Sequence, residues 1–198
     1  MQVLKDEVKN KIHQAALAEF KEKGFLNASM RSIAERGGMT VGNLYRYFKN
    51  KEDLFHAVIQ PAFQKIIDLI HFNKGQSFDG DIHVENFIES LNRGIVEIYK
   101  NHRTELLILI NGCSGTNYEK GKDEIVSLVE HRIKSVFFKR LEKKGIVIED
   151  TFLARVIAIS HIEGIIAILN HYDSEEKMEK MINQYFAFQI KDMLMRFS

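Results

Sequence analysis

The chain has 198 residues, 45% of them apolar, which is enough to bury the core of one domain or two small ones and too apolar for a disordered chain. Its 28 Lys and Arg nearly balance its 27 Asp and Glu, so the net charge of +1 gives no sign of a nucleic-acid partner. The single cysteine excludes an internal disulfide, and the N-terminus shows no signal-peptide pattern. These features predict a cytoplasmic protein.

Apolar runs are short and helix breakers are few. The longest purely apolar runs, 106–110 and 165–169, fall far short of the roughly 20 residues that span a bilayer, so no membrane association is expected. The 12 glycines and 1 proline are about half of average usage, and no long alternating β-branched run occurs. The composition therefore predicts an all-α fold.

The first fifty residues predict three helices. Apolar residues at helical spacing indicate a helix over about 3–23 that stops at Gly24. Ser29 is the expected N-cap of a short second helix that ends at Gly37-Gly38, and Thr40 that of a third over about 41–47. So short a connection between the last two is the spacing of a helix-turn-helix.

The rest of the chain predicts further helices and one clear loop. Asn50 is expected to cap the fourth helix, with Asp53 reaching back to it, and Pro61 inside that helix predicts a kink or a break. A loop is expected over 73–81, and glycines separate two later helices at 112–121. Those later helices are predicted over about 83–100, 103–111, 123–144, 150–171 and 174–197.

The predicted third helix carries chemistry suited to DNA. In a helix-turn-helix the second helix places its N-terminal residues against base edges in the major groove. Thr40 and Asn43 offer hydrogen bonds, Val41 can contact a thymine methyl group, and Gly42 lets the backbone approach closely. Three further side chains have spacings that suit phosphate contacts: Arg46, Tyr47 and Lys51.

These segments together resemble the N-terminal signature of TetR-family transcriptional regulators. The resemblance covers about residues 12–55 and is carried by more than a dozen positions in register: Ile12, Ala15-Ala16, Phe20, Gly24-Phe25, Ile33-Ala34, Gly38 to Phe48, and Lys51 to Leu54. It departs from the usual pattern at Ala28, Ser32 and Gly37-Gly38.

The resemblance implies a function and an organisation. It implies an all-α homodimer with a helix-turn-helix DNA-binding domain over 1–50 and an effector-binding and dimerisation domain over 51–198. Ser29 or Asn27 is expected to hold a phosphate, and Leu44 and Phe48 match core positions. The positions that match the DNA-contacting part of the motif are Thr40, Val41, Gly42, Asn43, Tyr45, Arg46, Tyr47 and Lys51. The alternative for Tyr45 and Tyr47 is packing between helices, and that for Lys5, Lys9 and Lys11 is a solvated face rather than an arm that approaches DNA.

The predicted helix over 150–171 is apolar nearly all round. Leu153, Val156, Ile157 and Gly164 lie near one stripe, and Phe152, Ile159, Ile162, Ile166 and Leu169 near another. Such a helix must be buried on both sides, which in a small chain suggests a partner subunit. The last two helices are therefore expected to form a homodimer interface, to which the final one adds Met178, Met181, Tyr185, Phe188 and Met193. A twofold dimer predicts a palindromic operator, and a monomer core is the alternative.

The effector is an unknown small molecule, and its pocket is the least determined feature. Polar or adaptable residues in apolar surroundings are the candidates: Asn92, Tyr99, Asn111, Cys113 and His161. Cys113 has two interpretations, a redox sensor or an inert thiol, and the absence of a second cysteine favours the inert thiol.

No enzyme motif is visible. The 8 histidines are scattered, no metal-binding or nucleotide-binding pattern occurs, and His161 and Glu163 point in different directions on a helix, so no catalytic site, metal or cofactor is expected.

The charge is unevenly distributed along the sequence. Residues 1–55 carry 10 Lys and Arg against 7 Asp and Glu, a net +3, and the remainder is net −2. We therefore predict a ligand-responsive DNA-binding repressor that its effector releases from the operator. The alternative is a dimeric small-molecule binding or adaptor protein that no longer reads DNA.

Overall fold

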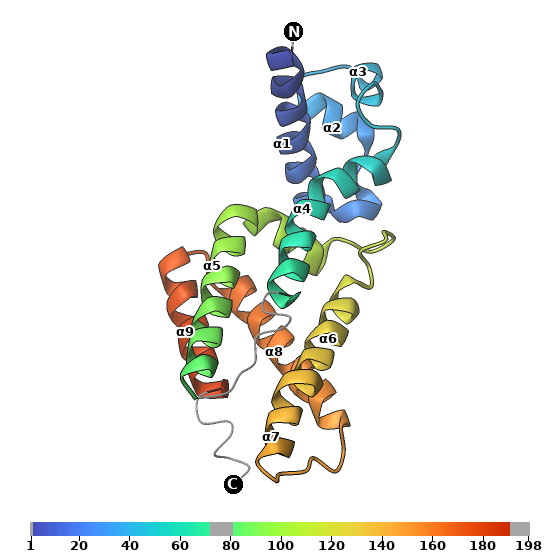
Figure 1. The fold of residues 1–198 in the computed structure, drawn as a ribbon. Coiled ribbons are helices and arrows are strands. Elements are labelled where there is room, and N and C mark those ends of the chain that lie inside the picture. Colours follow the sequence, from blue (N-terminus) through green and yellow to red (C-terminus); the bar gives the residue numbers. More distant parts are fainter. Residues whose placement is uncertain (1, 72–80, 191–198) are drawn as a thin grey trace. The chain divides into compact units, whose positions relative to one another are not determined.

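The computed structural model describes residues 2–71 and 81–190, and every regular element within these ranges is helical (Figure 1). In chain order the elements are α1 (Gln2–Asn27), α2 (Met30–Arg36), α3 (Val41–Tyr45), α4 (Lys51–His71), α5 (Asp81–Asn111), α6 (Gly121–Arg132), the π-helix η1 (Ile133–Phe138), α7 (Lys139–Lys143), α8 (Phe152–His171) and α9 (Glu175–Ile190). The predicted all-α class is confirmed. The loop predicted within 73–81 lies almost wholly outside the described residues, and so does the end of the last helix with Met193.

The caps of the helix-turn-helix are those that the sequence predicts. The Ser29 hydroxyl accepts a hydrogen bond from the Ser32 amide at 3.1 Å, at the start of α2. The Thr40 hydroxyl accepts one from the Asn43 amide at 3.2 Å, at the start of α3. Each hydroxyl accepts from an amide of the first turn, where helical partners are missing, and still has its own proton to donate.

Asn50 caps α4 as predicted, but Asp53 reaches back to Lys49 instead of Asn50, and the middle of α4 differs from the prediction. The Asn50 side chain accepts from the Asp53 amide at 2.7 Å, and the Asp53 carboxylate accepts from the Lys49 amide at 3.0 Å. The expected break at Pro61 is absent, because α4 is one helix from Lys51 to His71. Pro61 is exposed, and so is Ala57, whose carbonyl loses its usual donor, so water can solvate that carbonyl.

Two residues with non-helical backbone mark joints inside long helices. Gly24 in α1 has φ 68° and ψ 172°, so the first helix turns where the sequence predicts its end. His102 in α5 has φ −137° and ψ 30°, and it divides this helix at the gap predicted between 100 and 103.

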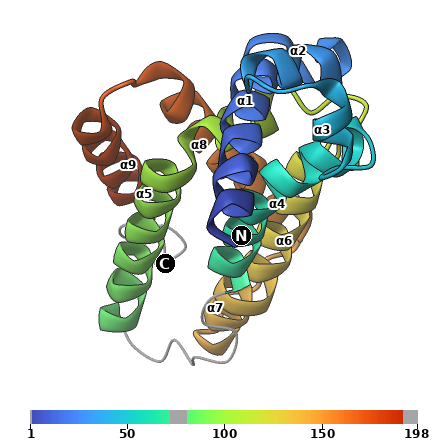
Figure 2. The same ribbon diagram turned by 90° about the horizontal axis from the view of Figure 1, so that it is seen from above.

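The chain forms two compact units. The N-terminal unit runs to Gln64 and also takes in His102–Gly121, whereas the C-terminal unit contains Lys65–Asn101 and the chain from Lys122 onward. In the N-terminal unit, α1, α2, α3 and the first half of α4 pack around a core centred on Phe20 and Phe55 (Figure 2).

The 102–121 segment is an integral part of the N-terminal unit. Ile108 and Tyr118 are buried in its core. The Phe25 amide donates to the Gly112 carbonyl at 2.8 Å, and a Cβ on Gly112 would lie only 3.3 Å from the Gly24 Cα, so two backbones cross here at close range. The Tyr118 hydroxyl lies 2.7 Å from His56 Nδ1, and burial raises the pKa of Tyr118 to about 12.

The C-terminal unit is built around α5, α8 and α9. Helix α9 lies beside α5, where Asn92 donates to Asn183 at 3.0 Å and Lys100 pairs with Glu175 at 2.6 Å (Figures 1 and 2). The buried residues Ala154 and Ala158 of α8 pack against Val126 and Ile133. Among the described residues, α8 alone is long and apolar enough to cross a membrane by length and composition, a property shared with core helices of soluble proteins.

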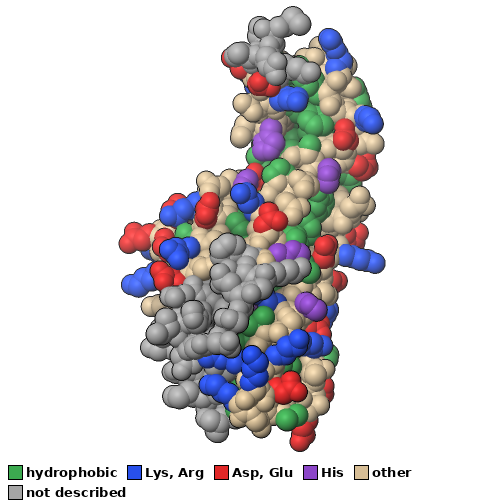
Figure 3. Space-filling view, in the orientation of Figure 1, with side chains coloured by type: hydrophobic (Ala, Val, Ile, Leu, Met, Phe, Trp, Pro, Cys, Tyr) green, Lys and Arg blue, Asp and Glu red, His purple; other side chains and the backbone are tan. Residues whose placement is uncertain are grey.

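Charge in the C-terminal unit is unevenly distributed. Lys and Arg side chains gather where α7 lies, in the lower part of the space-filling view (Figure 3). The sequence over 131–144 explains this, since it holds six Lys and Arg and one acid: Arg132, Lys134, Lys139, Arg140, Lys143, Lys144 and Glu142. The small negative charge of residues 56–198 therefore conceals a basic segment.

Candidate nucleic-acid interface

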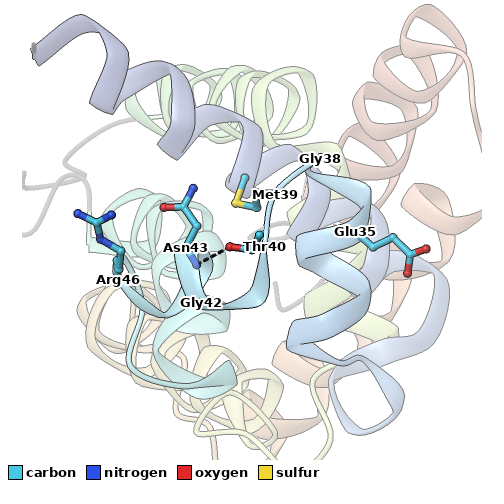
Figure 4. Close-up of a pocket in the computed structure, with 7 residues that line it drawn as sticks. All are labelled: Glu35, Gly38, Met39, Thr40, Gly42, Asn43 and Arg46. Carbon is cyan, nitrogen blue, oxygen red and sulfur yellow. Dashed lines mark hydrogen bonds between the residues drawn. The ribbon is translucent and has the colours of Figure 1, made fainter.

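An open surface hollow of about 880 Å³ lies at the turn between α2 and α3 (Figure 4). Its lining is formed by Glu35, Gly38, Met39, Thr40, Gly42, Asn43 and Arg46. Glu35, Gly38 and Met39 were not among the predicted site residues. Their position in the turn next to the Thr40 cap is the sequence signal that could have identified them.

The fold requires glycine at one of two positions in this hollow but not at the other. Gly38 has φ +64°, a left-handed conformation that side chains rarely adopt, so the turn itself requires glycine. Gly42 lies inside α3 without a positive φ, and a Cβ built there meets no atom within 4 Å. Nothing in the isolated fold therefore requires glycine at 42, in a helix where alanine would be preferred by about 1 kcal/mol.

The polar side chains of α3 extend into the hollow without internal partners. Asn43 and Arg46 project from the same side of the helix (Figure 4). Within the described part of the chain, neither side chain makes a hydrogen bond or an ion pair, and Arg46 is exposed. Tyr45 is 51% exposed, which argues against the packing alternative for this residue. A guanidinium, an amide and a phenol are thus available to a partner.

Other predicted DNA-contact residues pack against the core or make hydrogen bonds within the chain. Val41 and Tyr47 are half-buried and pack against the core, and Leu44 is fully buried, as its core assignment predicts. Phe48 also packs against this core. Asn27 donates to the Lys23 carbonyl at 3.3 Å, which leaves Ser29 as the capping residue at the start of α2.

Lys51 has a structural role that sequence analysis missed. Its ammonium group donates to the carbonyls of Phe25 at 2.7 Å, Ala28 at 2.9 Å and Leu26 at 3.3 Å. It also lies 4.4 Å from the centre of the Phe25 ring. The three ammonium protons are thus donated to carbonyls in the last turn of α1 and just after it. Only the tertiary fold brings these groups 23 to 26 residues apart into contact.

A buried carboxylate fixes α1 to α2. The Glu19 side chain is fully buried and accepts from Lys23 and Arg36, each at 2.9 Å. Lys23 also donates to the Ser32 hydroxyl at 3.3 Å, so Ser32 joins this cluster instead of completing a capping box. Burial alone would raise the pKa of Glu19, but the hydrogen bonds from Lys23, Arg36 and Ser32 outweigh it and lower the pKa below 4.5.

Replacing Glu19 with glutamine is expected to lower the free energy of unfolding by about 1–3 kcal/mol at neutral pH. Because folding lowers the pKa of Glu19, its carboxylate stabilises the fold fully above pH 4.5, and this contribution is lost as the pH falls through the lowered value. Urea unfolding of both proteins between neutral and acidic pH measures the difference, which should shrink on acidification. Glu22→Gln is the matched control, because Glu22 also pairs with Arg36 but is 58% exposed. Equal losses in the two variants would contradict the assignment.

The predicted effector residues lie in different compact units. Asn92, Tyr99 and His161 belong to the C-terminal unit, whereas Asn111 and Cys113 belong to the N-terminal one. Asn111 is exposed at the end of α5. Cys113 donates to the Leu109 carbonyl at 3.1 Å, and burial raises the pKa of its thiol, which favours the inert interpretation.

The three candidates of the C-terminal unit make separate contacts. Asn92 donates to Asn183, and the Tyr99 hydroxyl donates to the Tyr172 carbonyl at 2.8 Å. His161 lies 2.9 Å from the Ile157 carbonyl and contacts two aromatic rings of α9; burial lowers its pKa. In the ranges that the structure describes, no group of three His, Cys, Asp or Glu residues could hold a metal ion.

Comparison with known proteins agrees with this geometry. Residues 12–58 match the sequence model of the bacterial regulatory proteins of the tetR family, and this range covers most of α1, all of α2 and α3 and the start of α4. Residues 12–58 are thus similar to the DNA-binding part of the tetR family of bacterial regulatory proteins. The model describes regulatory proteins, in line with the DNA-binding regulator predicted from the sequence.

The chain is also similar to a curated relative in sequence and to solved structures in fold. An HTH-type transcriptional regulator of Staphylococcus aureus (strain USA300) is 39% identical over 74 residues, which cover 34% of this chain and only 40% of the relative's length. The TetR-family regulator PfmR of Thermus thermophilus has a TM-score of 0.64 at 17% identity, covering 92% of this chain and 95% of PfmR. The regulator FadR of Bacillus subtilis, solved with stearoyl-CoA, has a TM-score of 0.58 at 17% identity, covering 93% and 99%. At such identities the structures establish the fold alone: a TetR-type helical architecture along nearly the whole chain.

Proposed function

We propose that the protein is a homodimeric transcriptional repressor that binds a palindromic DNA operator and is released by a small-molecule effector in the cytoplasm. The observation that carries the DNA-binding part is the face of α3. There the fold leaves Asn43, Tyr45 and Arg46 exposed or uncommitted beside Gly42, a glycine that the isolated fold does not need.

Contacts to DNA divide by chemistry. Thr40, Val41 and Asn43 suit base edges, since they offer a hydroxyl, a methyl group and a bidentate amide at the N-terminal end of α3. Arg46 and the hydroxyls of Ser29, Tyr45 and Tyr47 suit phosphates. Lys51 contributes its charge alone, because its ammonium donors are engaged with α1.

Selection of DNA sequences with the purified protein, followed by two variants, tests this proposal. Arg46→Ala is expected to weaken binding to all sequences and to reduce the slope of log K against log salt by about 1, because one phosphate contact is lost. Asn43→Ala is expected to relax the preference at one base-pair position by about 1–3 kcal/mol. Binding is measured by fluorescence anisotropy at several salt concentrations. If no palindrome is selected, the adaptor alternative gains support.

A dimer is supported by the exposed apolar face of the C-terminal unit. Phe152, Val156 and Ile159 follow one stripe of α8 and are 62%, 49% and 41% exposed, and Phe188 of α9 is 75% exposed. Large apolar side chains that are exposed along one stripe of a helix indicate an interaction surface. A second copy of the chain is the occupant that we propose, through α8 and α9 of each subunit.

For the effector, the fold comparison suggests which compounds to test first. The B. subtilis FadR structure contains stearoyl-CoA, so long-chain acyl-CoA esters are the first class to screen against this chain. Asn92, Tyr99 and His161 stay as candidate pocket residues of the C-terminal unit, and Asn111 and Cys113 as candidates of the N-terminal unit. Release of labelled operator DNA on addition of palmitoyl-CoA, with palmitate and CoA as separate controls, tests this class.

A further inference from the structure

The turn between α2 and α3 fixes the backbone of Met39. The Met39 amide donates to the Ala34 carbonyl at 3.0 Å. One residue earlier, the Gly38 amide donates to the Glu35 carbonyl at 3.1 Å. With Gly38 at φ +64°, these two bonds form a Schellman motif, in which residues just beyond a helix satisfy its last carbonyls. The turn therefore sets the direction in which the Met39 side chain leaves the backbone.

Gly37 leaves room for the end of that side chain. Gly37 has φ −78° and ψ −1°, a right-handed conformation that residues with a side chain also adopt. A Cβ built on Gly37 would lie 3.0 Å from Met39 Cε, which is tighter than ordinary van der Waals contact. The missing side chain at position 37 thus makes space for the Met39 thioether, whereas glycine at position 38 is required by the backbone.

The Met39 side chain connects the core with the surface hollow. It is half-buried, packs against the core of the N-terminal unit and also lines the hollow. Figure 4 shows its thioether between Asn43 and the turn at Gly38. Among the described residues that line the hollow, Met39 has the only apolar side chain, since the others are glycines or polar residues. An apolar contact to the core commonly accompanies a Schellman motif, and a shorter side chain is enough for that contact.

An apolar group in this hollow suits one feature of the major groove. Thymine presents its C5 methyl group there, and an apolar side chain is what recognises it. Asn43 and Arg46 offer hydrogen bonds and charge, which a methyl group cannot use. Val41, which the sequence predicts to contact a thymine methyl group, is half-buried and packs against the core. A thioether is flexible and polarizable, so Met39 can adapt its end to such a partner.

We propose that Met39 is a specificity-determining residue, which places its thioether against the C5 methyl group of one thymine in each half-site, and that Gly37 sets the position of this thioether. The inference rests on the proposed function and adds the chemistry of one base-pair position to it. The contact is apolar, so it favours thymine without the salt dependence of a phosphate contact.

Replacing single thymines of the selected operator with uracil tests the proposal, because this change removes only the C5 methyl group. Binding of each duplex by the full-length protein is measured by fluorescence anisotropy. With wild-type protein, replacement of one thymine in a half-site is expected to lower the affinity about fourfold, the effect of burying one methyl group. With Met39→Val, thymine and uracil should bind equally at this position, because valine keeps a core contact but lacks the Sδ and Cε atoms. Uracil replacements at other thymines should have the same effects as with wild-type protein.

Gly37→Ala is the second variant. Its Cβ would displace Met39 Cε, the far end of a flexible side chain, so the fold should be retained. The fourfold loss of affinity on uracil replacement should then fall to less than about twofold. Val41→Ala is the matched control, because Val41 is an apolar residue at the start of α3. This control should leave the fourfold loss unchanged.

Three results would count against these assignments. A loss on uracil replacement that persists in folded Met39→Val, or an operator in which no thymine is sensitive to uracil, would overturn the proposal. Disappearance of the loss in Val41→Ala would assign the methyl contact to Val41 instead. A full fourfold loss in Gly37→Ala would refute the role of Gly37.

Folding and the proposed function are checked separately. If Met39→Val fails to fold by circular dichroism, Met39→Leu replaces it with the same expectation, because leucine ends one atom earlier than methionine. Absence of operator binding by wild-type protein would instead refute the proposed function.

Discussion

Replacing Gly42 with alanine is expected to weaken operator binding by about tenfold to a hundredfold while leaving the protein at least as stable. An added methyl group at a closely packed surface costs about 1–3 kcal/mol, and each 1.4 kcal/mol is about tenfold in affinity. In the free protein the same methyl group meets no atom within 4 Å and removes a poor helix former from α3. Fluorescence anisotropy with the selected operator and thermal unfolding of the same samples measure both effects.

Gly38→Ala is the matched control for this experiment. Gly38 lies in the same hollow and also has open space around it, but its φ of +64° makes any side chain strained. This variant is expected to lose about 1–2 kcal/mol of stability. The two glycines therefore separate a requirement of DNA from a requirement of the fold. If Gly42→Ala binds the operator as wild type does, α3 does not approach DNA closely at this residue.

Replacing Val156 with glutamate is expected to convert the protein to a monomer and to reduce operator affinity by about a hundredfold or more. Val156 is 49% exposed in the single chain, so the carboxylate stays solvated and the subunit stays folded. In the dimer the same carboxylate would be buried without a partner. A monomer engages one half-site at a time and loses the effective concentration that links the two. Sedimentation velocity and circular dichroism measure the assembly and the fold.

Val147→Glu is the control variant, at an exposed apolar residue outside the proposed interface. Val147 is 74% exposed in the connection between α7 and α8 and lies off the α8 stripe, so this variant should stay dimeric and bind the operator normally. A wild-type protein that is monomeric at micromolar concentration would refute the dimer. Co-sedimentation of wild-type protein with phospholipid vesicles would then indicate that a membrane covers α8.

Local signals predicted the helix-turn-helix well because its caps are local. Ser29, Thr40 and Asn50 each accept a bond from an amide three residues away, so a short stretch of sequence contains both partners. Of the kink or break predicted at Pro61, the break is wrong, because the effect of a proline depends on its surroundings. An exposed proline leaves a carbonyl that water can satisfy, and the helix continues.

The sequence could not predict the roles of residues whose partners lie far away along the chain. Lys51 shows this most clearly, since its position matched a DNA contact while its ammonium group satisfies carbonyls at the end of α1. The hydrogen bond from Arg132 to the Ile70 carbonyl had no signal in the sequence, because the two residues are 62 positions apart. The two apolar stripes predicted on α8 also agree only in part with its buried and exposed sides. The buried side contains the small residues Ala154 and Ala158, and the exposed side combines Val156 of one predicted stripe with Phe152 and Ile159 of the other.

The packing of residues 102–121 into the N-terminal unit has a consequence for protein engineering. A chimera that joins the first fifty residues to a foreign sensor would remove Phe55, Ile108 and Tyr118 from the core around Phe20. It would also leave the Phe25 amide without the Gly112 carbonyl. A transplant that keeps the DNA reader folded therefore needs two crossovers in the middle of the chain as well as one in α4. The specificity module is discontinuous in sequence, and recombination between related regulators must respect that.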